Sequence, residues 1–319
     1  MLVDPIFADL DREREVILEE IAMYEDSPQD LIHDLLADTL FDSHPLGRPV
    51  LGSRESISGM AEETIRGYHQ RYFQFGDMVV AAAGNVDHDQ LKELLLRTHG
   101  GVASGSKTAL EHTRPHITQR SAFLKKETEQ LHVALGSEGI PRNDPRRYTL
   151  SVLDSLLGGS LSSRLFQEVR EKRGLVYSIY SFCNMYRDTG LCGVYFGTRP
   201  DRADQVLEVV SRELETVRNE LVDLSELERT KEHLKGRIVL SMESTSARMN
   251  RLGKGVLTDA EILSLDEITE RIDAVTPAAV RELANLVFDP SRTTLVGIGS
   301  EEEVFRNALS SSGDSSEAA

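Results

Sequence analysis

The chain has 319 residues, 39% hydrophobic and 28% charged, which is the balance of a soluble globular protein with room for two domains. A formal net charge of −17 argues against nucleic acid as a partner, because phosphate binding needs basic patches. No run of eighteen apolar residues offers a membrane helix, and the acidic start of the sequence is unlike a secretory signal peptide. Two cysteines, Cys183 and Cys192, are too few for a disulfide framework, so we expect reduced thiols and a cytoplasmic protein.

The first hundred residues predict mostly helices. The apolar spacing of residues 9–24 indicates an amphipathic helix, and Ser27-Pro28 marks the start of a second one. A loop rich in Pro and Gly follows, and then a helix over residues 61–73. The apolar run DMVVAAAG, residues 77–84, is typical of a short buried strand.

The second part of the chain predicts a mixture of strands and helices. Residues 99–120 are rich in Gly, Ser, Thr, Pro and His and lack an apolar period, so we interpret them as an interdomain linker. Beyond them, QLHVALGSEG indicates a strand, and VYSIYSFCNM with GLCGVYFGT indicates a β-hairpin. Helices are predicted over residues 144–157, 160–173, 202–217, 225–242 and 276–288, before a last strand, TTLVGIGS.

An internal repeat organises the chain. Residues 60–87 match residues 275–302 in pattern without a gap, and Gly84 falls on Gly299, which sets the offset in residue number at 299 − 84 = 215. The repeat predicts two copies of one α+β domain, each with helices packed on an antiparallel-rich sheet. Because the second copy begins near Ser121, the first is expected to be short of its beginning by roughly a hundred residues. The predicted domains are residues 1–98, an incomplete first copy, and 121–308, with a disordered tail over 309–319.

Two pairs of residues stand out as candidates for chemistry. Glu13 and Glu20 lie seven residues apart and therefore two turns up one face of a helix, where they could supply one metal ligand and one supporting carboxylate. Spacing alone favours an ordinary solvated acidic face. Arg170 and Tyr177 bracket the expected helix stop at Gly174 and could hold a peptide carbonyl. Taken alone, they better suit an arginine that complements a helix dipole and a tyrosine in a strand.

Several long segments of the chain together carry a family resemblance. LGGSLSSRLFQEVREKRGLVYSIYSF, followed by DTGLCGVYFGTRPD, resembles the signature of the second domain of the pitrilysin/insulinase family of zinc metallopeptidases, which includes the mitochondrial processing peptidases. REREVILEEIAMYEDSP and HPLGRPVLGSRESI resemble the first domain just beyond its zinc motif. The similar segments occur in the family's order and run from about Asp4 to Val304.

The resemblance assigns roles to the candidate residues. Glu20 matches the family's third zinc ligand, and Glu13 matches the glutamate that supports the site. Arg170 and Tyr177 match the pair that the second domain contributes to substrate binding. The family's H-x-x-E-H motif, with two histidine ligands and the general base, is absent from all 319 residues. It would lie in the stretch that the repeat predicts to be missing.

The resemblance implies a zinc metalloendopeptidase acting on peptides or unfolded protein. We expect this chain, as a truncated form, to bind zinc poorly and to be inactive alone, because Glu20 is at most one ligand of the three that a catalytic zinc needs. The alternative is a non-catalytic scaffold subunit of a peptidase-type heterodimer. The expected partners are peptide substrates and either a second copy or a subunit that carries H-x-x-E-H, with no nucleic acid and no membrane.

Overall fold

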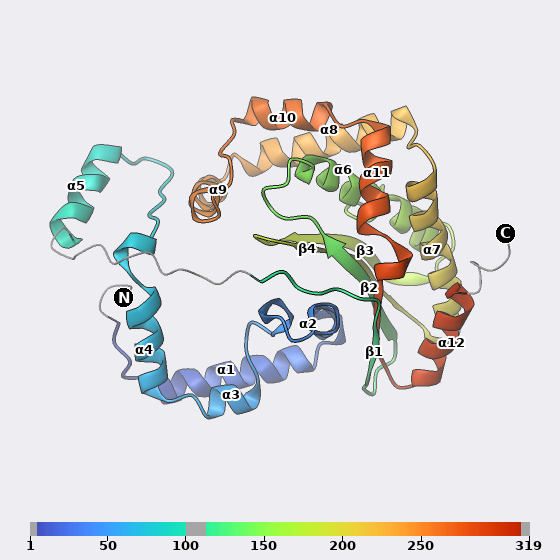
Figure 1. Ribbon diagram of the computed structural model, residues 1–319, viewed down its shortest axis with the longest axis horizontal. Coiled ribbons are helices and arrows are strands. Elements are labelled where there is room, and N and C mark those ends of the chain that lie inside the picture. The colour runs from blue at the N-terminus through green and yellow to red at the C-terminus, as the bar shows by residue number, and fades with distance from the viewer. Residues whose placement is uncertain (1–4, 100–112, 314–319) are drawn as a thin grey trace. The chain divides into compact units, whose positions relative to one another are not determined.

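The computed structural model describes residues 5–99 and 113–313, and within them one five-stranded mixed sheet forms (Figure 1). Its order is β1-β5-β2-β4-β3, with β1 and β5 parallel and the other three pairs antiparallel. The antiparallel-rich α+β domain predicted for the second copy is therefore confirmed. The strands are β1 (Ser121–Lys125), β2 (Leu131–Gly139), β3 (Val176–Met185), β4 (Gly190–Thr198) and β5 (Thr294–Gly299).

Helices pack on both faces of this sheet. One face carries α2 (Pro28–Phe41), whose buried Ile32, Leu36 and Leu40 recur every four residues and so share one side of the helix. The other face carries α6 and α11, and Ser137 of β2 donates a hydrogen bond to the carbonyl of Val287 in α11. The bounds on this side are α6 (Arg147–Leu157), α7 (Ala203–Asn219), α8 (Leu224–Ser241), α10 (Leu265–Asp273), α11 (Pro277–Val287) and α12 (Glu302–Gly313).

The elements of the structure follow the repeat inferred from the sequence. The helix α4 (Glu62–Tyr72) and α11 show the same offset at their starts, 277 − 62 = 215, and at their ends, 287 − 72 = 215. The short 3-10 turns Phe75–Asp77 and Pro290–Arg292 share it. Nearly the same offset relates α1 (Leu10–Glu25) to α8, α2 to α9 (Thr245–Leu257), α3 (Arg54–Ser58) to the end of α10 and α5 (His88–His99) to α12.

The strand predicted over residues 77–84 is not formed. The segment Val79–Gly84 corresponds to β5, since 79 + 215 = 294, yet it pairs with no strand among the described residues. A strand exists only when a neighbour satisfies its backbone groups, and the described part of the first copy contains no counterpart of β1 or β2. The apolar pattern of the segment is that of a strand, but no described residue supplies the partner strands that it needs.

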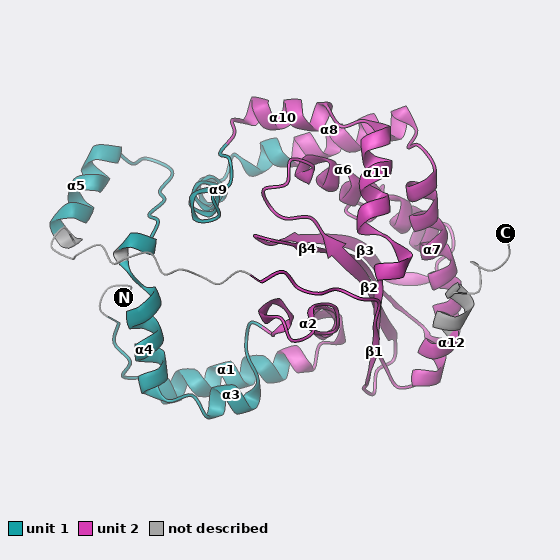
Figure 2. Ribbon diagram, viewed as in Figure 1, with its two compact units in different colours: residues 1–23, 50–112, 238–262 teal, residues 24–49, 113–237, 263–319 magenta. Residues whose placement is uncertain are grey.

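The two copies exchange helices. By compactness the chain forms two units, the first made of residues 1–23, 50–112 and 238–262 and the second of residues 24–49, 113–237 and 263–319 (Figure 2). The helix α2 comes from the first copy but packs on β2 and β5 in the second unit. Its counterpart α9 comes from the second copy but lies in the first unit, where a Cβ on Gly253 would sit 3.2 Å from Cβ of Ala81. Thus α2 of the first copy covers β5, and α9 of the second copy covers the corresponding segment Val79–Gly84.

Two further expectations need correction. The helix predicted over residues 160–173 begins only at Arg164, after a turn, and becomes a π-helix over Phe166–Glu171, which widens the backbone before Gly174. The tail was expected to be disordered from residue 309, but α12 continues to Gly313; residues 314–319 lie outside the described part. Most of the predicted linker, residues 100–112, also lies outside it.

A half-buried histidine lies between α2 and the sheet. The Nε2 atom of His33 is 2.8 Å from the hydroxyl of Tyr180, and its ring lies edge-on to Phe182 with centroids 4.7 Å apart. Burial lowers the pKa of His33 despite the attraction of Asp30. The unfolded chain therefore binds more protons than the folded one below about pH 6.5, so the stability that neutral His33 contributes is lost as the pH falls from there.

We expect the variant His33→Gln to be less stable than the wild type at pH 7.5, because it loses the ring contacts. The stability difference should narrow at pH 5.5, since only the wild type loses stability through protonation of residue 33. Urea unfolding followed by circular dichroism at the two pH values measures the difference. If the difference in free energy of unfolding between the two proteins is the same or larger at pH 5.5, the pKa of His33 is not lowered.

Candidate functional site

The two glutamates of the predicted metal half-site lie on α1. Glu13 and Glu20 are both exposed, and no hydrogen bond or ion pair to a described residue holds either carboxylate. Seven residues of helix separate them by about 10 Å along the axis. This spacing suits one ligand and one more distant supporting group.

The described residues were compared with the ligand set that a catalytic zinc requires. A catalytic zinc needs three protein ligands, commonly histidines and a carboxylate. Within residues 5–99 and 113–313 no group of three or more His, Cys, Asp and Glu side chains is placed to hold a metal ion. Glu20 would therefore need ligands from outside this set.

The structure brings Arg170 and Tyr177 together. The guanidinium carbon of Arg170 lies 5.0 Å from the ring centroid of Tyr177 and 4.7 Å from that of Phe166. The cation is thus held by two aromatic faces, which restricts its rotamers. Tyr177 is 76% exposed and Arg170 about a third exposed, so both remain accessible to a ligand.

The backbone fixes this arrangement on both sides. Gly174 takes a left-handed conformation, φ 59°, and its N–H donates to the carbonyl of Arg170 at 3.0 Å, closing the π-helix. In the next strand, Val176 pairs with Thr198 and Ser178 with Gly197, so Tyr177 is the extra residue of a β-bulge. The bulge re-aims the Tyr177 side chain at the start of edge strand β3.

The charges around Arg170 leave most of its guanidinium free of carboxylates among the described residues. Its ion pair with the exposed Glu171 is long, 3.9 Å from Nε to Oε1. Glu168 instead binds Lys172 and Arg173, whose hydrogen bonds lower the pKa of its carboxyl group. The Arg170 guanidinium therefore keeps donors available for a carbonyl or carboxylate.

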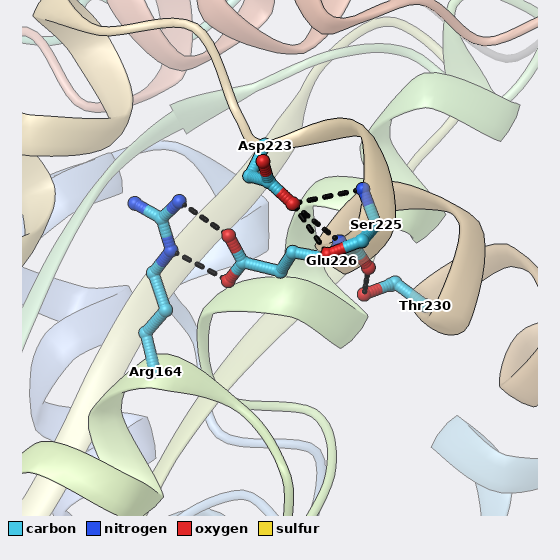
Figure 3. A network of polar contacts seen from close by, with 5 residues as sticks. All are labelled: Arg164, Asp223, Ser225, Glu226 and Thr230. Atoms are coloured by element: carbon cyan, nitrogen blue, oxygen red, sulfur yellow. Dashed lines mark hydrogen bonds and ion pairs between the residues drawn. The ribbon is translucent and has the colours of Figure 1, made fainter.

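A bidentate ion pair anchors the segment that leads into the π-helix (Figure 3). Arg164 Nε and Nη2 donate to the two oxygens of Glu226 at 2.9 and 2.8 Å, and both side chains are mostly buried. Glu226 lies in the first turn of α8, where Asp223 accepts hydrogen bonds from the N–H groups of Ser225 and Glu226. The pair joins two segments that are distant in the sequence, and its hydrogen bonds raise the pKa of Arg164.

Phe166 and the Arg164–Glu226 pair are not among the residues predicted from the sequence. Phe166 precedes Arg170 by four residues, a spacing that places side chains together on a helical turn and could have indicated the contact. The partner of Arg164 could not have been inferred, because no local spacing connects residues 164 and 226.

Comparison with known proteins places this fold in a family. The family described as "Peptidase M16 inactive domain" matches residues 60–234. A protein of Streptomyces coelicolor named an uncharacterized zinc protease is 42% identical over 283 residues, covering 86% of this chain and 62% of the relative. A Bacillus subtilis protein, also named an uncharacterized zinc protease, is 39% identical over 280 residues, covering 88% of this chain and 68% of the relative. The chain thus spans about three-fifths of the Streptomyces relative's length.

Solved structures show the same fold. A protease from Helicobacter pylori aligns with a TM-score of 0.83 at 19% identity, covering 93% of this chain and 73% of that one. An M16 inactive domain from Pseudomonas fluorescens aligns with a TM-score of 0.81 at 22% identity, covering 94% of this chain and 73% of that one. A chain of complex III2 from Candida albicans aligns with a TM-score of 0.80 at 18% identity, covering 98% of this chain and 76% of that one. No helix in the described residues is long and apolar enough to span a membrane. The chain belongs to the M16 family of peptidases, the pitrilysin/insulinase-type family that its sequence resembles.

Proposed function

We propose that this chain contributes to a zinc-dependent metalloendopeptidase but is inactive by itself. Its similarity to proteins named zinc proteases supports a function in peptide hydrolysis. The arrangement of Arg170 between Phe166 and Tyr177 carries the proposal for substrate binding, because a restrained, accessible cation beside a phenol suits a peptide carbonyl. In this proposal Glu20 is the third zinc ligand and Glu13 supports it.

Inactivity follows from the chemistry that this chain lacks. When bound in such enzymes, zinc supplies a Lewis acid and an activated water. None of the 319 residues forms the H-x-x-E-H motif that would provide two ligands and the base. The remaining role of this chain is to bind and orient the peptide.

The test compares the chain alone with the chain mixed with a polypeptide that carries H-x-x-E-H from a relative. Alone, we expect no stoichiometric zinc and no chelator-sensitive cleavage of an unfolded peptide. The mixture should gain both. Changing Glu20→Gln should then reduce cleavage at least about 100-fold, whereas Glu13→Gln should weaken zinc affinity about 10- to 100-fold.

Glu19→Gln is the matched control, because Glu19 is an exposed neighbour on the same helix. It should leave zinc binding and cleavage unchanged. Zinc-dependent cleavage by the chain alone would refute the proposed inactivity. Activity that survives Glu20→Gln in the mixture would refute the ligand assignment.

A second candidate is a non-catalytic partner subunit. The matching family description names an inactive domain, which favours this role. Glu13 and Glu20 speak against it, because a scaffold has no need of a metal half-site. In the mixture, a scaffold would support cleavage that is insensitive to Glu20→Gln but is reduced by Arg170→Ala.

A further inference from the structure

The first unit has almost no core of its own. Among its side chains whose exposure the structure describes, Ile21 is the only apolar one that is buried. Most of the exposed large apolar side chains in the described part of the chain belong to this unit, including Val80, Leu96 and Val256. Exposed apolar surface on this scale marks an interaction site.

The exposed apolar surface includes a groove beside Val79–Gly84. A cavity of about 550 Å³ is bounded by this segment, by α5 and by α9, with Val79, Val80, Leu91, Leu95, Leu252 and Val256 in its lining. Exposure alternates along the segment: Val80 and Ala82 are exposed, whereas Val79 and Ala81 are half-buried. A period of two is that of an extended strand with one covered face.

The second copy shows what fills the equivalent place. All six residues of β5 are buried, and both edges of the strand are paired, parallel to β1 and antiparallel to β2. A Cβ on Gly297 would lie 2.6 Å from Phe305 of α12 and 3.0 Å from Phe123 of β1. A Cβ on Gly299 would lie 2.9 Å from Leu131 of β2. The side chains that cover β5 on this face come from α12, β1 and β2.

The first unit has only part of this set. The helix α5 corresponds to α12, and the offset of 302 − 88 = 214 places Leu91, a groove residue, at the position of Phe305. The helix α9 covers the other face, as α2 covers β5. No described residue occupies the places of Phe123 and Leu131, and both backbone edges of Val79–Gly84 lack a strand from the described part of the chain.

We propose that Val79–Gly84 is an acceptor strand whose occupant is a polypeptide carrying the first half of the same repeat. The counterpart of this occupant in the second copy is residues 121–219. One of its strands pairs parallel to Val79–Gly84 and another pairs antiparallel, and their apolar side chains enter the groove between α5 and α9. The inference rests on the repeat and the groove and not on the proposed peptidase activity.

The experiment separates docking from zinc chemistry. The probe is the first half of the first repeat of the Bacillus subtilis relative, made as a separate polypeptide with the histidines of any H-x-x-E-H motif changed to Ala. Titration calorimetry with the full chain measures binding, and hydrogen exchange locates it. We expect a 1:1 complex in which the amides of residues 79–84 become protected.

Val80→Asp tests the groove, because it places a charge among apolar side chains on a residue that is 59% exposed in the chain alone. It should weaken binding at least about 10-fold. The matched control is Val50→Asp, at a fully exposed valine of the same unit outside the groove, which should bind within about 3-fold of the wild type.

The proposal is overturned if the probe does not bind, if its binding protects amides other than those of residues 79–84, or if Val80→Asp binds the probe as tightly as the wild type does. It is also overturned if residues 79–84 are protected in a dimer of the chain alone, because the occupant would then be a second copy. Docking without later restoration of cleavage would count against the proposed function only.

Discussion

Substituting Ala for Gly158 is expected to destabilise the second unit by about 3 kcal/mol or more, at or above the usual upper end of what overpacking costs. Gly158 ends α6, and its backbone lies directly against β3. An added Cβ would stand 2.2 Å from the backbone nitrogen of Ser181 and 2.9 Å from its Cβ. Backbone on both sides leaves no flexible side chain to move, so α6 and β3 must separate.

The local hydrogen bonds increase this cost. Ser181 donates to the Asp154 side chain at 2.6 Å, and burial raises the pKa of the Asp154 carboxyl group. A shift of β3 would break this contact between α6 and the strand and would take the Ser181 donor away from the half-buried Asp154. Because β3 also carries Tyr177, the variant should lose the Tyr177–Arg170 contact as well.

Urea unfolding followed by circular dichroism measures the effect, with hydrogen exchange of the β3 and β4 amides to assign it to this unit. Gly236→Ala is the matched control: Gly236 lies within α8, and an added Cβ would meet nothing within 4 Å. The control should be neutral or more stable by up to about 1 kcal/mol. Equal stability of the two variants would show that α6 and β3 are not in close contact.

The second large effect is expected at Leu36, where substitution by Ala should cost about 3 to 5 kcal/mol. Leu36 is fully buried under the sheet, and its Cδ2 would lie 2.9 Å from a Cβ on Gly136 of β2. The glycine leaves a hollow that the leucine fills, so truncation leaves a cavity against rigid backbone. Ile32 and Leu40 on the same side of α2 hold the helix in place and limit its collapse.

Urea unfolding with circular dichroism again gives the free energy of unfolding. Leu161→Ala is the control for the chemical change, because Leu161 is 72% exposed in the same unit. It should change stability by no more than about 0.5 kcal/mol. A Leu36→Ala variant as stable as this control would mean that α2 does not cover the sheet of the second copy.

Much of the fold was predictable because periodicity and the repeat are local signals. The hairpin β3–β4, the helices α7, α8 and α11 and the strand β5 all lie where the apolar patterns place them. The position of β5 between β1 and β2 was not predictable, because pairing between segments so distant in the sequence leaves no trace in local spacing. The strand predicted over residues 77–84 was wrong for a related reason. The apolar pattern of residues 79–84 is that of a strand, but no described residues pair with them.

The candidate site was predictable only in part. Resemblance pointed to Arg170 and Tyr177, and the structure brings their side chains together. The π-helix, the β-bulge and Phe166, which make that contact, depend on backbone detail that residue types do not specify. For Glu13 and Glu20, both exposed on α1, the structure adds their separation but not their ligand role, which stays a prediction.

The strand order has a consequence for synthesis. β5 lies in the interior of the sheet, yet it begins at Thr294, far along the chain from the end of β2 at Gly139 (294 − 139 = 155). At roughly 5 to 20 residues per second, a ribosome needs about 8 to 30 s to cover that distance. Until then the nascent sheet is divided into β1 on one side and β2, β4 and β3 on the other, with both inner edges exposed. A premature stop before residue 294 would leave these edges permanently open, so such products should aggregate rather than persist as a smaller folded protein.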